Sequence, residues 1–252
     1  MASITAENLC LDYPIYEASR SFRTKLFARH VGGVIAEGKN GGVPTIRALS
    51  DINLDLKDGD RLGFVGHNGA GKTTLLKVLG GFYKPTEGSI RITGHSYSLV
   101  TMGIGIDPDD TGYENIMTCG LYLGMSPEEI REKTDEIAEF TELGDFLHLP
   151  VKTYSTGMVV RLTFAITTAT KPEIMLMDEG IGAGDARFAR KAKQRVDDMI
   201  TSCSIMVVAS HSTSLIQELC NEAALLSHGT IVARGAVDDI LKQYEEMNSA
   251  AS

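Results

Sequence analysis

The residues best suited to chemistry form one continuous run: Gly66, His67, Asn68, Gly69, Ala70, Gly71, Lys72 and Thr73. The run fits G-x-x-x-x-G-K-[ST], a consensus typical of loops that bind phosphate groups. Glycines allow a sharp bend that brings backbone N–H groups up to phosphate oxygens. We therefore expect Lys72 to reach the β- and γ-phosphates of a nucleotide and the Thr73 hydroxyl to bind Mg²⁺.

Two acidic residues follow an apolar stretch further along the chain. Residues 174–177 are apolar, and Asp178 and Glu179 come directly after them. An apolar strand that ends in these acids is the Walker B pattern, in which Asp178 would hold Mg²⁺ through water and Glu179 would polarise the attacking water. The pattern is weak by itself, because many strands end at polar residues. It gains weight from the glycine-rich loop upstream.

Two more polar residues occupy suggestive places. Asp185 stands at a turn that enters a predicted helix, residues 186–200, and His211 closely follows the apolar run 205–209. A lone histidine is more often a structural residue. At the carboxyl end of a core strand in a doubly wound sheet, however, His211 would lie where ligands bind.

These residues need elements that position them. Residues 61–65 predict a buried strand and residues 74–79 a helix, so the glycine-rich loop would join a strand to a helix N-terminus, whose field favours anions. A chance glycine-rich turn is the alternative, and it lacks such flanks. Further strands are predicted at 3–12, 46–56, 89–93, 223–226 and 230–234, and further helices at 158–169 and 237–248.

Another helix is predicted after Ser126. The run Ser126-Pro-Glu-Glu129 supplies a capping serine, a proline at the first helical position and a glutamate at the third. Ile130, Ile137 and Phe140 then share one face, and Gly144 fits a helix stop.

Composition limits the classes of protein that fit. The chain has 252 residues, 43% of them hydrophobic, which suits one large domain or a domain with a subdomain. The net charge of −9 argues against a nucleic-acid binder that uses a basic face. The cysteines lack metal-ligand spacing, which favours free thiols in a reducing compartment. The start resembles no signal peptide, and no apolar run is long enough to span a bilayer.

Residues 18–45 read as an insertion. Its first half interleaves basic and apolar side chains at spacings that suit a basic amphipathic helix: Arg20, Phe22, Arg23, Lys25, Leu26, Phe27 and Arg29. The glycine-rich stretch 32–42 predicts a flexible loop. A solvated surface excursion and a contact with a membrane surface or membrane partner both remain open.

The ordered set of motifs resembles the nucleotide-binding subunit of ATP-binding cassette (ABC) transporters over nearly the whole chain. Tyr154–Met158 stands at the signature position, usually Leu-Ser-Gly-Gly-Gln, Asp185 at the D-loop and His211 at the switch histidine. The resemblance implies an α/β fold of the P-loop NTPase class, with a mixed central sheet flanked by helices, an antiparallel β region near the N-terminus and an inserted helical subdomain. It implies one domain over 1–252, with core parts 46–113 and 171–252, a helical subdomain at 114–170 and a gate-helix region at 18–45.

The resemblance also implies site residues. Those for ATP are Tyr13, Gly66, His67, Asn68, Gly69, Ala70, Gly71, Lys72, Thr73, Thr74, Ser155, Thr156, Gly157 and Asp185. Those for catalysis are Glu179, His211 and Lys72, and those for Mg²⁺ are Thr73 and Asp178. Tyr13 lies where the family places an aromatic ring on adenine, with Tyr16 as the alternative. Ser155 and the Gly157 amide, at a helix N-terminus, can meet the γ-phosphate of ATP held by a second copy.

Three departures narrow the resemblance. The signature carries Thr156 and Met158 in place of glycine and glutamine, and the insertion 18–45 is unusual. No glutamine occurs between Lys72 and Gln194, so Asp107 occupies the position of the Q-loop glutamine and is the candidate third metal residue. Together these features look like the ATPase subunit of bacterial exporters of O-antigen, capsule or teichoic acid. Because the chain stops at Ser252, we expect it to lack the C-terminal carbohydrate-binding domain of some members.

Such a subunit implies partners and a location. It would act as a homodimer with shared ATP sites, at the cytoplasmic face of the bacterial inner membrane, beside a separate permease that moves a lipid-linked glycan. A P-loop GTPase or small-molecule kinase fits less well, because the chain lacks Asn-Lys-x-Asp. A non-transport ABC ATPase would carry long coiled coils or two cassettes. An ABC importer fits poorly, because the chain lacks the Q-loop glutamine and carries the insertion. The ATPase subunit of another ABC transporter, for small molecules or lipids, stays as the alternative, and a soluble non-transport ABC ATPase is the less favoured one.

Overall fold

The computed structural model describes residues 1–14, 34–36, 45–98, 105–178 and 186–250. The chain divides into two compact units. The first comprises Met1–Val100, Glu173–Glu179 and Ser204–Ser252, and the second comprises Thr101–Pro172 and Gly180–Cys203. Within the described residues, no helix combines the length and the hydrophobicity that a bilayer crossing needs.

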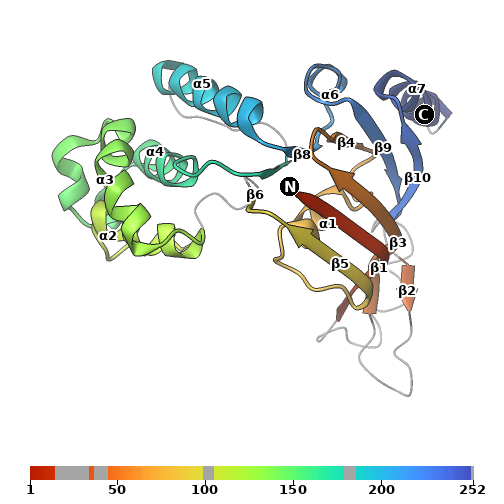
Figure 1. Ribbon diagram of the computed structural model, residues 1–252, viewed down its shortest axis with the longest axis horizontal. Helices are drawn as coiled ribbons and strands as arrows, with labels where there is room; N and C mark the ends of the chain where they lie inside the picture. The colour runs from red at the N-terminus through yellow and green to blue at the C-terminus, as the bar shows by residue number, and fades with distance from the viewer. Residues whose placement is uncertain (15–33, 37–44, 99–104, 179–185, 251–252) are drawn as a thin grey trace, which may run out of the picture. The chain divides into compact units, whose positions relative to one another are not determined.

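The first unit begins with an antiparallel sheet (Figure 1). Its strands are β1 (Ser3–Pro14), β2 (Val34–Ala36), β3 (Thr45–Lys57) and β5 (Glu87–Thr93), in the order β2-β3-β1-β5. Side chains alternate along β3, where Ile52, Leu54 and Leu56 are buried and the residues between them are exposed. This period of two is what one covered face of a sheet requires.

The short strand β2 corrects one expectation. The glycine-rich stretch 32–42 was predicted to be a flexible loop, but the backbone of residues 34–36 pairs with β3, with Ile35 opposite Ile46. Two β-branched residues in succession favour a strand, and the edge of β3 offers the ladder. The rest of the insertion, residues 18–33 and 37–44, lies outside the described residues.

The second sheet of this unit is mostly parallel. Its strands are β4 (Arg61–Val65), β6 (Ser96–Ser98), β7 (Ile174–Asp178), β8 (Ile205–Ala209), β9 (Glu222–Ser227) and β10 (Thr230–Gly235). They lie in the order β10-β9-β4-β8-β7-β6, and only the β9–β10 pair is antiparallel. All five residues of β8 are buried, as central parallel strands require. The predicted fold class, with its mixed sheet and antiparallel N-terminal region, is confirmed.

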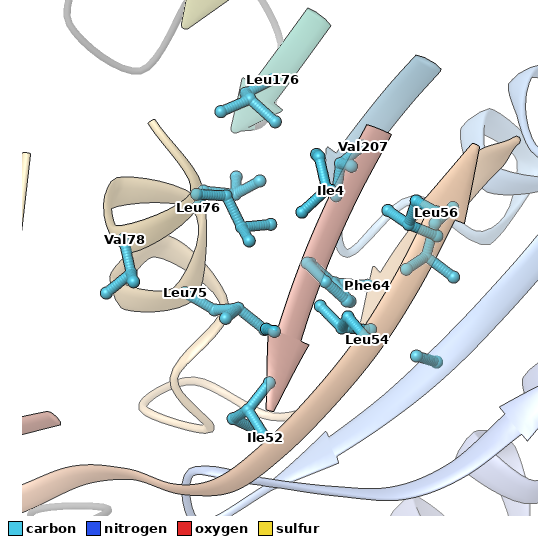
Figure 2. Close-up of a cluster of buried hydrophobic side chains, with 14 of the residues drawn as sticks. Ile4, Ile52, Leu54, Leu56, Phe64, Leu75, Leu76, Val78, Leu176 and Val207 are labelled. Atoms are coloured by element: carbon cyan, nitrogen blue, oxygen red, sulfur yellow. The ribbon is translucent and has the colours of Figure 1, made fainter. Parts of the chain in front are cut away.

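Helix α1 (Lys72–Leu79) and the strands of both sheets share one hydrophobic core (Figure 2). The labelled side chains come from α1, β1, β3, β4, β7 and β8, and each is at most 3% exposed: Ile4, Ile52, Leu54, Leu56, Phe64, Leu75, Leu76, Val78, Leu176 and Val207. Because α1 begins where the glycine-rich loop ends, this packing fixes the loop against the sheet. Helix α7 (Val237–Ala250) contacts β9, β10 and the short helix α6 (Thr213–Leu219).

The second unit is helical. It contains α2 (Gly112–Tyr122), α3 (Pro127–Thr141), the 3₁₀ turns η3 (Gly144–His148) and η4 (Val151–Thr153), α4 (Thr156–Thr167) and α5 (Ala186–Ser202). The predicted cap of α3 is present, because the Ser126 and Glu129 side chains each accept the other residue's backbone N–H. The predicted stop at Gly144 is wrong: α3 ends at Thr141 and Glu142 takes the left-handed conformation, φ 56°. Gly144 instead begins η3.

Helix α2 was not predicted. Thr111 caps it, and Thr111 and Glu114 form a second reciprocal capping box. The signal was in the sequence, since a threonine followed three residues later by glutamate is a helix start.

Candidate functional site

The glycine-rich loop joins β4 to α1 as expected. At Gly66, φ is 152°, and an added Cβ would lie 2.3 Å from the carbonyl oxygen of Leu226. Only glycine fits there without a shift of the backbone. No side chain caps the first turn of α1, so its N–H groups are left for an incoming anion.

A hairpin turn holds the loop from outside. The Gly229 N–H, between β9 and β10, donates to the Ala70 carbonyl at 2.9 Å, and the Ser50 N–H donates to the Gly229 carbonyl at 2.9 Å. Gly229 has φ 79°, and a Cβ there would lie 2.3 Å from the Ala48 carbonyl oxygen. The loop is therefore fixed between the start of α1, the β9–β10 turn and β3.

Lys72 folds back over the same loop. Its Nζ donates to the Gly66 carbonyl at 2.6 Å and to the His67 carbonyl at 3.3 Å, and lies 3.4 Å from His211 Nε2. The side chain is only 8% exposed. A nearly buried ammonium held by carbonyl oxygens at the mouth of an anion-binding loop can exchange those oxygens for phosphate oxygens.

A cavity of about 530 Å³ opens above the loop, within the first unit. It brings together most of the residues predicted for that unit, and its lining is Tyr13, Ile46, Ala48, Asn68, Gly69, Ala70, Gly71, Lys72, Thr73, Thr74, Asp178 and His211. The volume falls in the range of small-molecule sites. The lining combines the phosphate loop with Tyr13, Ile46 and Ala48 from strands β1 and β3.

The order of the strands in the parallel sheet explains why Asp178 and His211 line the cavity together. Strands β7 and β8 are parallel neighbours, with Asp178 opposite Ala209, so Asp178 and His211 reach the same edge. The Thr73 hydroxyl and the Asp178 carboxylate share the lining, and oxygen donors of this kind are what Mg²⁺ prefers. Glu179 and Asp185 lie outside the described residues, as does Tyr16.

The surroundings of Tyr13 could not be predicted from the sequence. Tyr13 lies opposite Ile46 in the β1–β3 ladder, which explains why Ile46 lines the cavity. The Tyr13 ring meets the Tyr83 ring edge-on, with centroids 5.5 Å apart. Burial raises the pKa of Tyr13, so the phenol stays neutral at physiological pH.

The signature residues belong to the second unit. Ser155 caps α4, and its Oγ accepts the Met158 N–H at 3.3 Å. Thr156 and Gly157 form the first turn and are exposed. The Tyr154 hydroxyl donates to the Phe146 carbonyl at 2.6 Å, which ties the segment to η3. The helix N-terminus expected for this motif is present.

Asp107 also lies in the second unit, in the segment before α2. Its Oδ1 accepts the Asp109 N–H at 2.9 Å. The fully buried side chain of Asn115 holds the backbone here: it accepts the Asp107 N–H at 2.8 Å and donates to the carbonyls of Asp107, Asp110 and Thr111. The sequence analysis did not predict this role of Asn115.

Comparison with known proteins agrees with the geometry. Residues 49–182 match the family described as ABC transporter. The O-antigen export system ATP-binding protein RfbE of Yersinia enterocolitica is 47% identical over 92% of this chain and 97% of its own length. RfbB of Myxococcus xanthus, also named for O-antigen export, is 38% identical, but the chain spans only 47% of it. The teichoic acids export ATP-binding protein TagH of Shouchella clausii is 38% identical, and the chain spans 55% of it.

Solved structures show the same fold. A dimeric ATP-binding cassette, MJ0796, bound to ADP and Pi has a TM-score of 0.64 and 21% identity, over 93% of this chain and 98% of that one. The ATP-binding subunit of another ABC transporter has a TM-score of 0.66 and 18% identity, over 96% of this chain and 93% of that one. With the phosphate loop, the Walker B strand and the signature helix in the family's order, the chain belongs to the ABC transporter family, as an ATP-binding cassette ATPase.

Proposed function

We propose that this chain binds and hydrolyses MgATP as a homodimer and so powers export of a lipid-linked polysaccharide through a separate membrane permease. The observation that carries the ATPase part is the cavity that gathers Lys72, Thr73, Asp178 and His211 above the phosphate loop. The export part is supported by the relatives named for O-antigen and teichoic acid export. Such a subunit works at the cytoplasmic face of the inner membrane.

Phosphoryl transfer to water needs charge neutralisation and an oriented nucleophile, with little covalent chemistry for the protein. The loop amides and Lys72 bind the β- and γ-phosphates, and the Thr73 hydroxyl and Asp178 are the residues that would hold Mg²⁺. When bound, Mg²⁺ neutralises charge on the phosphate oxygens. Glu179 orients and polarises the attacking water, and His211, beside Lys72, contacts the γ-phosphate end. Asp107 is proposed to replace the missing Q-loop glutamine.

Replacement of Glu179 by glutamine tests the ATPase part. Loss of a positioned base typically costs about 10²–10⁴ in rate. Single-turnover hydrolysis should fall by that amount while ATP affinity is kept. Glu218→Gln, on the exposed face of α6, is the matched control and should hydrolyse like the wild type. Near-normal turnover in Glu179→Gln would move the catalytic role to another residue.

The shared site follows from the signature helix. In the proposed dimer, Ser155 of the partner subunit and the N-terminus of that subunit's α4 meet the γ-phosphate bound in the first copy. Glu179→Gln should therefore dimerise on addition of MgATP, which light scattering detects. A monomer at tens of micromolar protein, with and without MgATP, would refute the shared site.

The basic part of the insertion is proposed to act at the membrane. Arg20, Arg23, Lys25 and Arg29 lie outside the described residues, in a chain of net charge −9. Near an anionic surface each basic side chain contributes roughly 1 kcal/mol. Replacement of all four by serine should leave basal ATPase intact and reduce glycan export in cells. Unchanged export would refute the proposal and indicate that this segment is a solvated helix with no role at the membrane.

A further inference from the structure

We infer that Tyr83 is a positioning residue for nucleotide binding, which holds the Tyr13 ring in the orientation needed to stack on the base. The inference deepens the proposed function and rests on Tyr13 being the base-stacking residue.

The two rings form a defined pair. Their centroids are 5.5 Å apart and their planes are 84° from parallel, an edge-to-face arrangement that aromatic quadrupoles favour. Such a pair restrains both rings but uses at most one face of either. A face of Tyr13 is therefore left for a base in the cavity that Tyr13 lines.

The turn after α1 delivers Tyr83 to this place. Helix α1 ends at Leu79, and the Phe82 N–H donates back to the Lys77 carbonyl at 2.9 Å. That bond curls the chain over the end of the helix, so Tyr83 comes from the same rigid element that begins at the phosphate loop. Tyr83 is 36% exposed, whereas a side chain that served only to pack the hydrophobic core would be buried.

Tyr13 has a second restraint on the same helix. The Thr74 side chain, one residue after Thr73, and the Tyr83 side chain both lie close enough to the Tyr13 hydroxyl to influence its pKa, in opposite directions. The start of α1 thus places Thr74 near the Tyr13 hydroxyl, and the turn after α1 places Tyr83 against the ring. Because one helix supplies both contacts, the base end of the cavity is kept in register with the phosphate end.

If Tyr83 positions the base-stacking ring, its replacement should affect only ligands that carry a base. A ligand with a purine base should depend on Tyr83, whereas inorganic tripolyphosphate, which has phosphates alone, should not. Tyr83→Ala should raise the Kd and KM for ATP about threefold to tenfold, the loss expected for one aromatic pair, with kcat unchanged. Tyr83→Phe keeps the ring and removes only the hydroxyl that interacts with Tyr13, so it should retain most of the wild-type affinity.

The experiment measures binding of ATP and of tripolyphosphate to the full chain by calorimetry, together with steady-state ATPase. Its variants are Tyr83→Ala, Tyr83→Leu, Tyr83→Phe and Tyr13→Ala, and circular dichroism checks their folding. Tyr83→Leu keeps apolar volume without a ring and should behave like Tyr83→Ala. Tyr122→Ala, on α2 and 70% exposed in the wild type, is the control and should match the wild type.

Three results would overturn the inference. If Tyr13→Ala weakens ATP binding and Tyr83→Ala does not, Tyr83 is not a positioning residue, while the proposed function stands. If Tyr83→Ala weakens tripolyphosphate as much as ATP, its role is structural support of the phosphate loop. If Tyr13→Ala leaves ATP affinity unchanged, base stacking by Tyr13 fails and the inference fails with it. The ATPase proposal is judged separately by Glu179→Gln.

Discussion

Replacement of Asn115 by alanine should destabilise the segment that carries Asp107. Asn115 is fully buried and makes four hydrogen bonds to this segment. Two of the acceptors keep other donors, because Thr111 O also accepts the Asn115 N–H and Asp110 O accepts the Val151 N–H. The Asp107 N–H and C=O lose the partner that Asn115 provides.

The magnitude follows from these two groups. Each unsatisfied buried polar group costs about 1–3 kcal/mol, and this cost is reduced where water can reach the exposed residue Asp107. We expect a loss of about 2–4 kcal/mol in the free energy of unfolding, which for a chain of this size lowers Tm by about 4–8 °C.

Thermal unfolding followed by circular dichroism measures the effect, and hydrogen exchange localises it. The Asp107 and Asp109 amides should exchange faster in Asn115→Ala, while the amides of β8 should not. Asn115→Asp is the sharper variant, because its carboxylate would face three carbonyl oxygens at neutral pH. It should be less stable than Asn115→Ala at pH 8 and recover as the pH falls and the new carboxyl gains a proton. A Tm for Asn115→Ala equal to that of the wild type would refute the reasoning.

Lys72, Arg47 and the buried Cys119 give three further predictions. Lys72→Ala removes the ammonium nearest the phosphate loop and should weaken ATP binding by about 10-fold to 100-fold, as for a lost charged hydrogen bond, with a much smaller effect on Tm; equilibrium binding and calorimetry decide. Arg47 bonds both oxygens of Asp12 and holds the pKa of that carboxyl below its usual 3.8. Arg47→Met should therefore cost about 1–2 kcal/mol near neutral pH, and urea titrations should show this difference fading as the pH falls below 3.8. Burial raises the pKa of Cys119 from 9.0 to about 11, so at pH 9 its native alkylation should be at least about fiftyfold slower than in the unfolded chain. The stability that this neutral thiol contributes should be present below pH 9 and decline towards pH 11.

The local sequence was enough to predict a feature when all of its residues belong to one short, continuous segment. The glycine-rich loop, Lys72 and Thr73 were found because strand, turn and helix are contiguous. The cap of α3 was found for the same reason. Asp178 and His211 needed only the rule that carboxyl ends of parallel strands meet at one edge.

Contacts between residues far apart in the sequence could not be predicted. Tyr83 stands after a helix and Tyr13 near the end of the first strand, and no periodicity links them. Asn115 reads as a polar residue within a helix, and only the folded segment shows that its amide replaces missing backbone partners. The edge strand β2 was hidden by neighbouring glycines, because its pairing depends on a free ladder along β3.

The β9–β10 turn keeps the phosphate loop ordered before any nucleotide binds. The Gly229 N–H to Ala70 bond and the close approach of Gly66 to Leu226 hold the loop while the cavity is empty. The conformational entropy of ordering these backbone dihedrals, about 1–2 kcal/mol per residue, is therefore lost during folding and not when the nucleotide arrives. More of the interaction energy of the phosphates then remains as affinity. A longer or looser hairpin turn at Gly229, far along the chain from the motif, would make the same phosphate loop a weaker binder with every motif residue intact.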